Sequence, residues 1–99
     1  MIRRHALLLC LLVLAGCGPS SEERENRKTF EFLLTAVSLK NAKELEKDAK
    51  RIEERHAAGK LSGARHRDLQ GIIEKARTGD WGEAERMAYE FREAQPFFK

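Results

Sequence analysis

Apolar residues recur every three or four positions through most of this sequence, and no proline occurs from residue 20 to 95. This spacing places the apolar side chains along one side of an α-helix, whereas a half-buried β-strand alternates polar and apolar residues. The clearest stripe consists of Phe30, Leu34, Val37, Asn41, Leu45, Ala49, Ile52 and His56. The sequence is therefore predicted to fold as an all-α protein, a small antiparallel helical bundle or hairpin.

The first helix is predicted to run without a break over about residues 22 to 58, because Gly59 is a favourable residue for ending a helix. Its middle is less regular, because Asn41 interrupts the apolar stripe. Asn41 followed by Glu44 has the pattern of a capping box, which would start a new helix. A break between Leu39 and Asn41 is therefore the alternative to one long helix.

Two shorter helices are predicted to follow, over about residues 62 to 78 and 81 to 95. Ser62 is a favourable N-cap for the first of them. Asp80 and Glu83 have the pattern of a second capping box, and the last helix would end before a proline. Alanines between the larger residues of this last helix would let it approach a neighbouring helix closely.

The first seventeen residues have the three parts of a secretory signal in the usual order. Residues 1–5 are a short basic start, residues 6–15 are an uncharged apolar run, and Leu14-Ala15-Gly16-Cys17 is a small-residue cleavage site. The apolar run is too short to cross a bilayer, which takes about 20 residues. We therefore expect an exported protein.

The ending Leu14-Ala15-Gly16-Cys17 resembles the lipobox of bacterial lipoproteins. The resemblance implies that residues 1–16 are removed and that Cys17 is lipidated, which would hold the protein on a membrane through two or three acyl chains. In that family an aspartate after the cysteine often retains the protein at the inner membrane. Gly18 stands there instead, which implies the periplasmic face of the outer membrane in a bacterium with two membranes.

Residues 17–28 are expected to form the lipidated N-terminus and a tether, because residues 18–27 contain no apolar side chain larger than proline. Residues 29–99 would form a single helical domain. Cys10 would leave with the signal and the thiol of Cys17 would carry the lipid, so no disulfide is expected to stabilise the domain.

Charge argues against nucleic acid as a partner. The chain has 19 basic and 16 acidic side chains, and 17 basic ones remain when Arg3 and Arg4 are removed with the signal. Both signs are interspersed, as on a solvated helix surface, and no basic face carries interleaved aromatic residues.

A helix over residues 22–58 would be about 55 Å long, and each shorter helix only about 25 Å. The short helices could not cover its membrane-proximal half, so Phe30, Leu34 and Val37 are a candidate protein interface. A second copy of the chain, another envelope protein, or the C-terminal Phe97-Phe98 could cover this face. If the first helix breaks instead, these residues become ordinary core.

Few residues suggest chemistry. His56 and His66, with Glu53 and Glu54 near the first, could in principle hold zinc, but their spacing matches no zinc motif. Ser62 lies in a sequence that lacks the nucleophile-elbow and phosphate-loop patterns. We therefore expect no catalytic residue, no metal and no cofactor, and thus a protein that is not an enzyme.

Residues 79–96 resemble the second helix of a tetratricopeptide repeat. The residues that carry the resemblance are Gly79-Asp80-Trp81-Gly82-Glu83-Ala84, Tyr89, Ala94 and Pro96. Phe91 departs from the pattern, which has a small residue there, and no second copy occurs at a period near 34. We interpret the stretch as a helical hairpin turn that such repeats also use, and a degenerate repeat is the alternative.

The expected function is that of a membrane-anchored, non-catalytic helical module for protein interaction or structure. The partner would be a second copy or another envelope protein. The alternative is a tethered module that binds a small envelope ligand, a peptide or a glycan, in a groove near Trp81, Tyr89 and Phe91.

Overall fold

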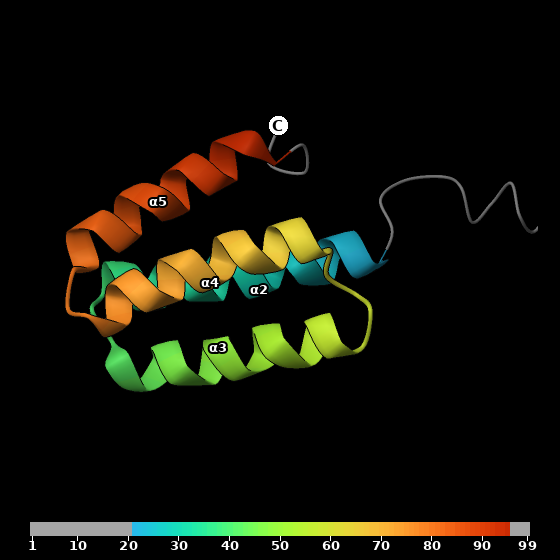
Figure 1. The fold of residues 1–99 in the computed structure, drawn as a ribbon, viewed down its shortest axis with the longest axis horizontal. Coiled ribbons are helices and arrows are strands. Elements are labelled where there is room, and N and C mark those ends of the chain that lie inside the picture. Colours follow the sequence, from blue (N-terminus) through green and yellow to red (C-terminus); the bar gives the residue numbers. More distant parts are fainter. Residues whose placement is uncertain (1–20, 96–99) are drawn as a thin grey trace, which may run out of the picture.

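The computed structural model describes residues 21–95, which form four α-helices and no β-strand. The helices are α2 (Ser21–Ser38), α3 (Ala42–Ala57), α4 (Gly63–Arg77) and α5 (Trp81–Ala94). They run up and down in turn, so that α2 packs against α3 and α5, and α4 packs against α3 and α5 (Figure 1). The all-α fold and the small antiparallel bundle predicted from the sequence are confirmed.

The prediction of one unbroken helix over residues 22–58 is wrong, and the alternative break at Leu39 to Asn41 is right. The Asn41 amide donates to the Ala36 carbonyl at 2.9 Å, and the Lys40 amide donates to the Val37 carbonyl at 3.1 Å. Lys40 has a φ of 53°. This pair of hydrogen bonds around a left-handed residue is a Schellman motif, which ends a helix and turns the chain.

All three helix ends inside the bundle use this motif. After α3 the left-handed residue is Gly59, with φ 75°, and after α4 it is Gly79, with φ 88°. The N-caps that begin the next helices are Asn41, Ser62 and Asp80, whose side chains accept backbone N–H groups three residues later. The bundle therefore repeats one local rule, a left-handed residue followed by a polar cap.

The folded part begins at Ser21, eight residues before the predicted start of the domain at residue 29. Residues 21–28, which the predicted domain division placed in the tether, therefore belong to α2, in agreement with the predicted helix start at about residue 22. Polar contacts hold this part of α2 against the rest of the bundle. Asn26 is buried, donates through Nδ2 to the Lys60 carbonyl at 3.1 Å, and accepts from Arg55 Nε at 2.8 Å. A search for apolar side chains does not find contacts of this kind.

The core lies between the four helices. Its largest fully buried apolar side chains are Phe30, Leu33, Val37, Leu45, Ile52 and Ile72. The rings of Phe30 and Phe91 lie 5.0 Å apart between centroids, which joins α2 to α5. Ala84 and Ala88 of α5 are fully buried, in agreement with the predicted close approach of this helix.

The expectation that Phe30, Leu34 and Val37 form a bare face is also wrong. Phe30 and Val37 are each 1% exposed, and Leu34 is half-buried against the core. Because the chain turns back after Leu39, α3 and α5 both pack against α2. These side chains contribute to the domain's own stability and are not free to bind a partner.

Candidate functional site

Two large apolar side chains on α2 stay outside the core. Phe32 is 50% exposed and Leu39 is 71% exposed. The Leu39 amide donates to the Thr35 carbonyl at 3.0 Å, so the helical course continues through Leu39. Residues seven apart on a helix lie on the same side, and Thr35, which is exposed, lies between them. We call Phe32, Thr35 and Leu39 the α2 strip.

A buried acid on α3 supports one edge of the α2 strip. The guanidinium carbon of Arg51 lies 5.2 Å from the centroid of the Phe32 ring, close enough for a cation–π contact. Arg51 Nη1 also donates to Asp48 Oδ1 at 2.9 Å. Arg51 therefore joins an exposed aromatic ring to the side chain of Asp48, which has no exposed surface.

Asp48 is in an unfavourable environment for a carboxylate. Burial raises the pKa of Asp48, the negative charge of Glu44 raises it further, and Arg51 acts in the opposite direction. Its Oδ2 has no hydrogen-bond partner within residues 21–95. Because no surface of Asp48 is exposed, it cannot meet a substrate, and we assign it a positioning role toward Arg51. One sign of this burial in the sequence was missed, because Asp48 lies within the stripe that contains Leu45 and Ile52.

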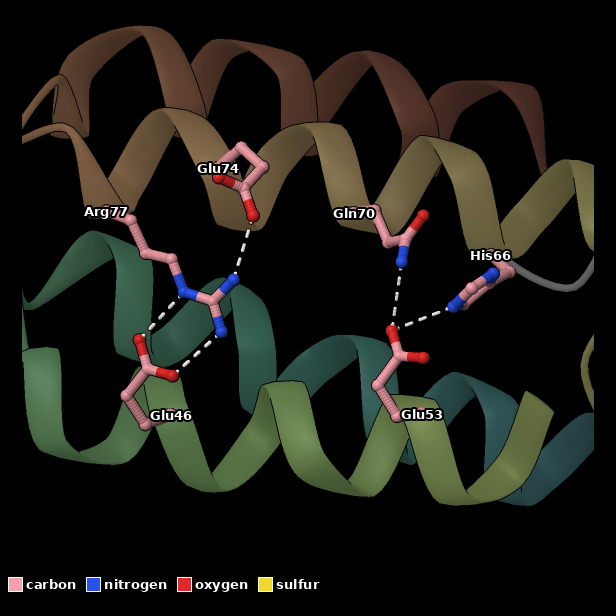
Figure 2. A network of polar contacts seen from close by, with 6 residues as sticks. All are labelled: Glu46, Glu53, His66, Gln70, Glu74 and Arg77. Atoms are coloured by element: carbon pink, nitrogen blue, oxygen red, sulfur yellow. Dashed lines mark hydrogen bonds and ion pairs between the residues drawn. The ribbon is translucent and has the colours of Figure 1, made fainter. Parts of the chain in front are cut away.

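A charged network covers the side formed by α3 and α4 (Figure 2). Arg77 donates to both carboxylate oxygens of Glu46, at 2.9 and 2.8 Å, and to Glu74 at 2.8 Å. The hydrogen bonds from Arg77 hold the pKa of Glu46 below its usual range. A cavity of about 320 Å³ lies beside these residues and is also lined by Ala49 and Ile73. Its carboxylates already have hydrogen-bond partners, Arg77 for Glu46 and Glu74 and His66 with Gln70 for Glu53, so it is better explained as a solvated helix face than as a binding site.

Two histidines that the sequence places on different helices stack against each other. The His56 and His66 rings are 3.8 Å apart between centroids and nearly parallel, with 7° between their planes. His66 Nε2 lies 2.8 Å from Glu53 Oε2, and this hydrogen bond lowers the pKa of Glu53. His56 Nδ1 lies 3.2 Å from the Leu61 carbonyl oxygen and so acts as the donor. The described residues contain no group of three His, Cys, Asp or Glu side chains arranged to hold a metal ion.

The predicted ligand groove of Trp81, Tyr89 and Phe91 does not form as one site. Phe91 is 7% exposed and packs on Phe30, Trp81 is half-buried against the core, and Tyr89 is exposed with Arg92 over its ring. A groove of about 340 Å³ does lie between α4 and α5. It is lined by Arg67, Asp68, Gly71, Ile72, Met87, Glu90, Phe91 and Ala94. Of the three predicted residues it contains Phe91 alone, because Trp81 and Tyr89 lie on other sides of α5.

Some sequence predictions fall on residues that the structure does not describe. The lipidation site Cys17, the signal over residues 1–16 and the C-terminal Phe97-Phe98 lie outside residues 21–95. Of the four described helices, none is long and apolar enough to span a bilayer.

The chain was compared with models of protein families, with curated proteins and with solved structures, and none of the three comparisons found a match.

Proposed function

We propose that this chain is a lipid-anchored, non-catalytic helical module of the bacterial envelope that binds a partner protein through the α2 strip. The observation that carries the proposal is the pair Phe32 and Leu39. They are 50% and 71% exposed and lie on one side of the same helix. Amphipathic helices recognise partners through apolar side chains at this spacing.

The anchor in this proposal rests on the sequence of residues 1–17, whose ending resembles a lipobox. Lipidation of Cys17 would place the module on the periplasmic face of the outer membrane, in a host with two membranes. Confinement to a surface raises the effective concentration of two proteins that share it. A contact as small as the α2 strip can then be useful even if it is weak in solution.

The chemistry of the α2 strip indicates what kind of partner it fits. Arg51 lies beside Phe32 and its side chain is 42% exposed, so one edge of the strip carries a positive charge. A complementary surface would place apolar side chains opposite Phe32 and Leu39 and a carboxylate opposite Arg51. A helix of another envelope protein, or of a second copy, can present such a pattern. The alternative function, a small ligand bound near Trp81, has less support because Trp81 and Tyr89 do not line the groove between α4 and α5.

The test is the native mass of the full chain, extracted from membranes in mild detergent. We expect a subunit that lacks residues 1–16, carries acyl groups and sits in a larger complex. The double variant Phe32→Glu, Leu39→Glu should release the subunit from that complex without changing its melting temperature by much, since both side chains are exposed.

Tyr89→Glu is the matched control, because Tyr89 is another exposed large side chain, 41% exposed, and belongs to α5 and not to the α2 strip. It should leave the complex intact. A lipidated subunit that stays monomeric, or a complex that survives the double variant, would contradict the proposed interface. A subunit without acyl groups would contradict the anchor.

A further inference from the structure

The start of α2 lies at one end of the bundle together with the connection between α3 and α4, and α5 ends toward the same side (Figure 1). We call this the N-terminal end. It is held together by polar contacts between helices. Arg55 pairs with Glu22 at 2.9 Å, and Arg65 pairs with Glu23 at 3.0 Å. The end is therefore a fixed surface of the bundle and not a frayed helix start.

The spacing between Cys17 and α2 limits how far this end can be from a membrane. α2 begins at Ser21, four residues after Cys17. Four residues span at most about 14 Å, even when fully extended. The head-group layer on one side of a bilayer is itself about 5 to 8 Å thick. A lipid on Cys17 would thus keep the N-terminal end at or within a few ångströms of the head groups.

The exposed residues of the N-terminal end suit a close approach to such a surface. The connection between α3 and α4 and the two helix ends beside it are built mostly of small, exposed residues. These are Ala57, Ala58, Gly59, Ser62, Gly63 and Ala64. The same connection carries one exposed cation, Lys60, and the carboxylates of Glu22 and Glu23 are neutralised by their arginine partners. Lys60 would lie within a Debye length, about 10 Å, of the lipid phosphates.

We propose that the N-terminal end rests on phospholipid head groups, so that the bundle stands on the membrane and presents the opposite end outward. This inference rests on the lipid anchor of the proposed function. The surface that meets the lipid is the connection between α3 and α4, with Lys60 toward the phosphates. The opposite end carries Leu39, the most exposed residue of the α2 strip. The strip then runs away from the membrane and ends where an envelope partner can reach it.

The experiment measures the depth of a fluorescent label on the full, lipidated chain in vesicles of phosphatidylethanolamine and phosphatidylglycerol. Cys17 is occupied by lipid, so one new cysteine gives one label. Ala57→Cys and Lys43→Cys form a matched pair, because both residues are exposed and lie at opposite ends of α3. They are 14 residues apart, which is about 21 Å along the helix.

We expect lipids with a quencher on the head group to quench the Ala57→Cys label several-fold more than the Lys43→Cys label. Equal quenching of the two labels would mean that the bundle lies flat, and stronger quenching at Lys43→Cys would mean that it is inverted. Either result overturns the orientation. A second pair, Ala64→Cys and Thr78→Cys at opposite ends of α4, gives the same reading if a variant of the first pair does not fold.

Flotation of the vesicles separates this inference from the function on which it rests. If the chain does not float with the vesicles and its mass shows no acyl groups, the anchor fails and the orientation falls with it. If it floats and the labels report a flat or inverted bundle, the anchor stands and only the orientation is wrong.

Discussion

The buried carboxylate of Asp48 holds the guanidinium of Arg51 at 2.9 Å, and Arg51 in turn lies over the exposed ring of Phe32. Among residues 21–95, Asp48 is the only acidic residue that is buried. Arg51 therefore links the buried carboxylate, whose burial costs free energy, to the α2 strip that we propose as the interface. This link also leads to a prediction about stability.

Asp48→Asn should stabilise the domain at about pH 7 by roughly 1 kcal/mol, because it removes a buried charge whose second oxygen is unpaired. The pKa of Asp48 is raised in the folded state. Its contribution to stability is therefore fully present below the ordinary pKa of aspartate and is lost as pH rises through the raised value. Urea unfolding should show the gain of the variant at neutral pH and its disappearance at about pH 3. Asp68→Asn, at an exposed aspartate of α4, is the control and should change little.

Glu53→Gln should destabilise the domain near neutral pH, because the Glu53 carboxylate accepts from His66 and Gln70 (Figure 2). The hydrogen bond from His66 lowers the pKa of Glu53. The stability that Glu53 contributes is therefore present above the ordinary pKa of glutamate and is lost as pH falls through the lowered value. The Glu53 side chain is 52% exposed, so solvent screening should keep the effect below about 1 kcal/mol.

Thermal melts at a series of pH values check this prediction. The melting temperatures of Glu53→Gln and the unmodified domain should differ at neutral pH and converge in acid. Glu54→Gln, at the exposed neighbouring position, should show no such convergence. A Glu53→Gln deficit of the same size at every pH would mean that the carboxylate charge is not what matters.

Lys40→Gly should stabilise the domain by about 1 kcal/mol, because Lys40 has a φ of 53°, where a side chain is strained and glycine is not. Gly59 and Gly79 already occupy the matching positions after α3 and α4. Lys50→Gly is the contrasting variant, since Lys50 is exposed in the middle of α3 and glycine there should cost about 1 kcal/mol. Chemical unfolding of both variants should give shifts of opposite sign.

Phe30→Ala should destabilise the domain by about 3 to 5 kcal/mol, because it empties a fully buried site against Phe91. Phe32→Ala, two residues along the same helix, removes the same group from a position that is 50% exposed and should cost less than about 1 kcal/mol. Denaturant midpoints give the comparison. Similar losses for the two variants would mean that Phe32 contributes to the core as Phe30 does.

Much of the fold could be predicted from the sequence because the signals for it are local. Helical spacing gave the all-α class, and Gly59, Ser62, Gly79 and Asp80 marked helix ends that the structure confirms. The break after α2 uses the same motif, but a lysine stands at the left-handed position. Lysine is not typical of the left-handed conformation, so Lys40 did not indicate a helix end. The capping pattern that starts at Asn41 indicated the break instead.

The candidate site could not be predicted because it depends on which helices pack together. Once α2 ends at Ser38, α3 and α5 cover Phe30 and Val37, and only Phe32 and Leu39 remain exposed. A stripe of apolar residues does not say which of its members will be covered. The placement of residues 21–28 in the tether has a related cause, because Asn26 is held by hydrogen bonds to residues about thirty positions away.

The start of α2 and the end of α5 point toward the same end of the bundle, which has a consequence for protein engineering (Figure 1). A four-helix ring in which each helix contacts its two neighbours does not depend on which of its connections is covalent. A flexible linker that joins Gln95 to Ser21, with the chain opened at the exposed Gly79, would therefore keep every helix pairing in a circularly permuted domain.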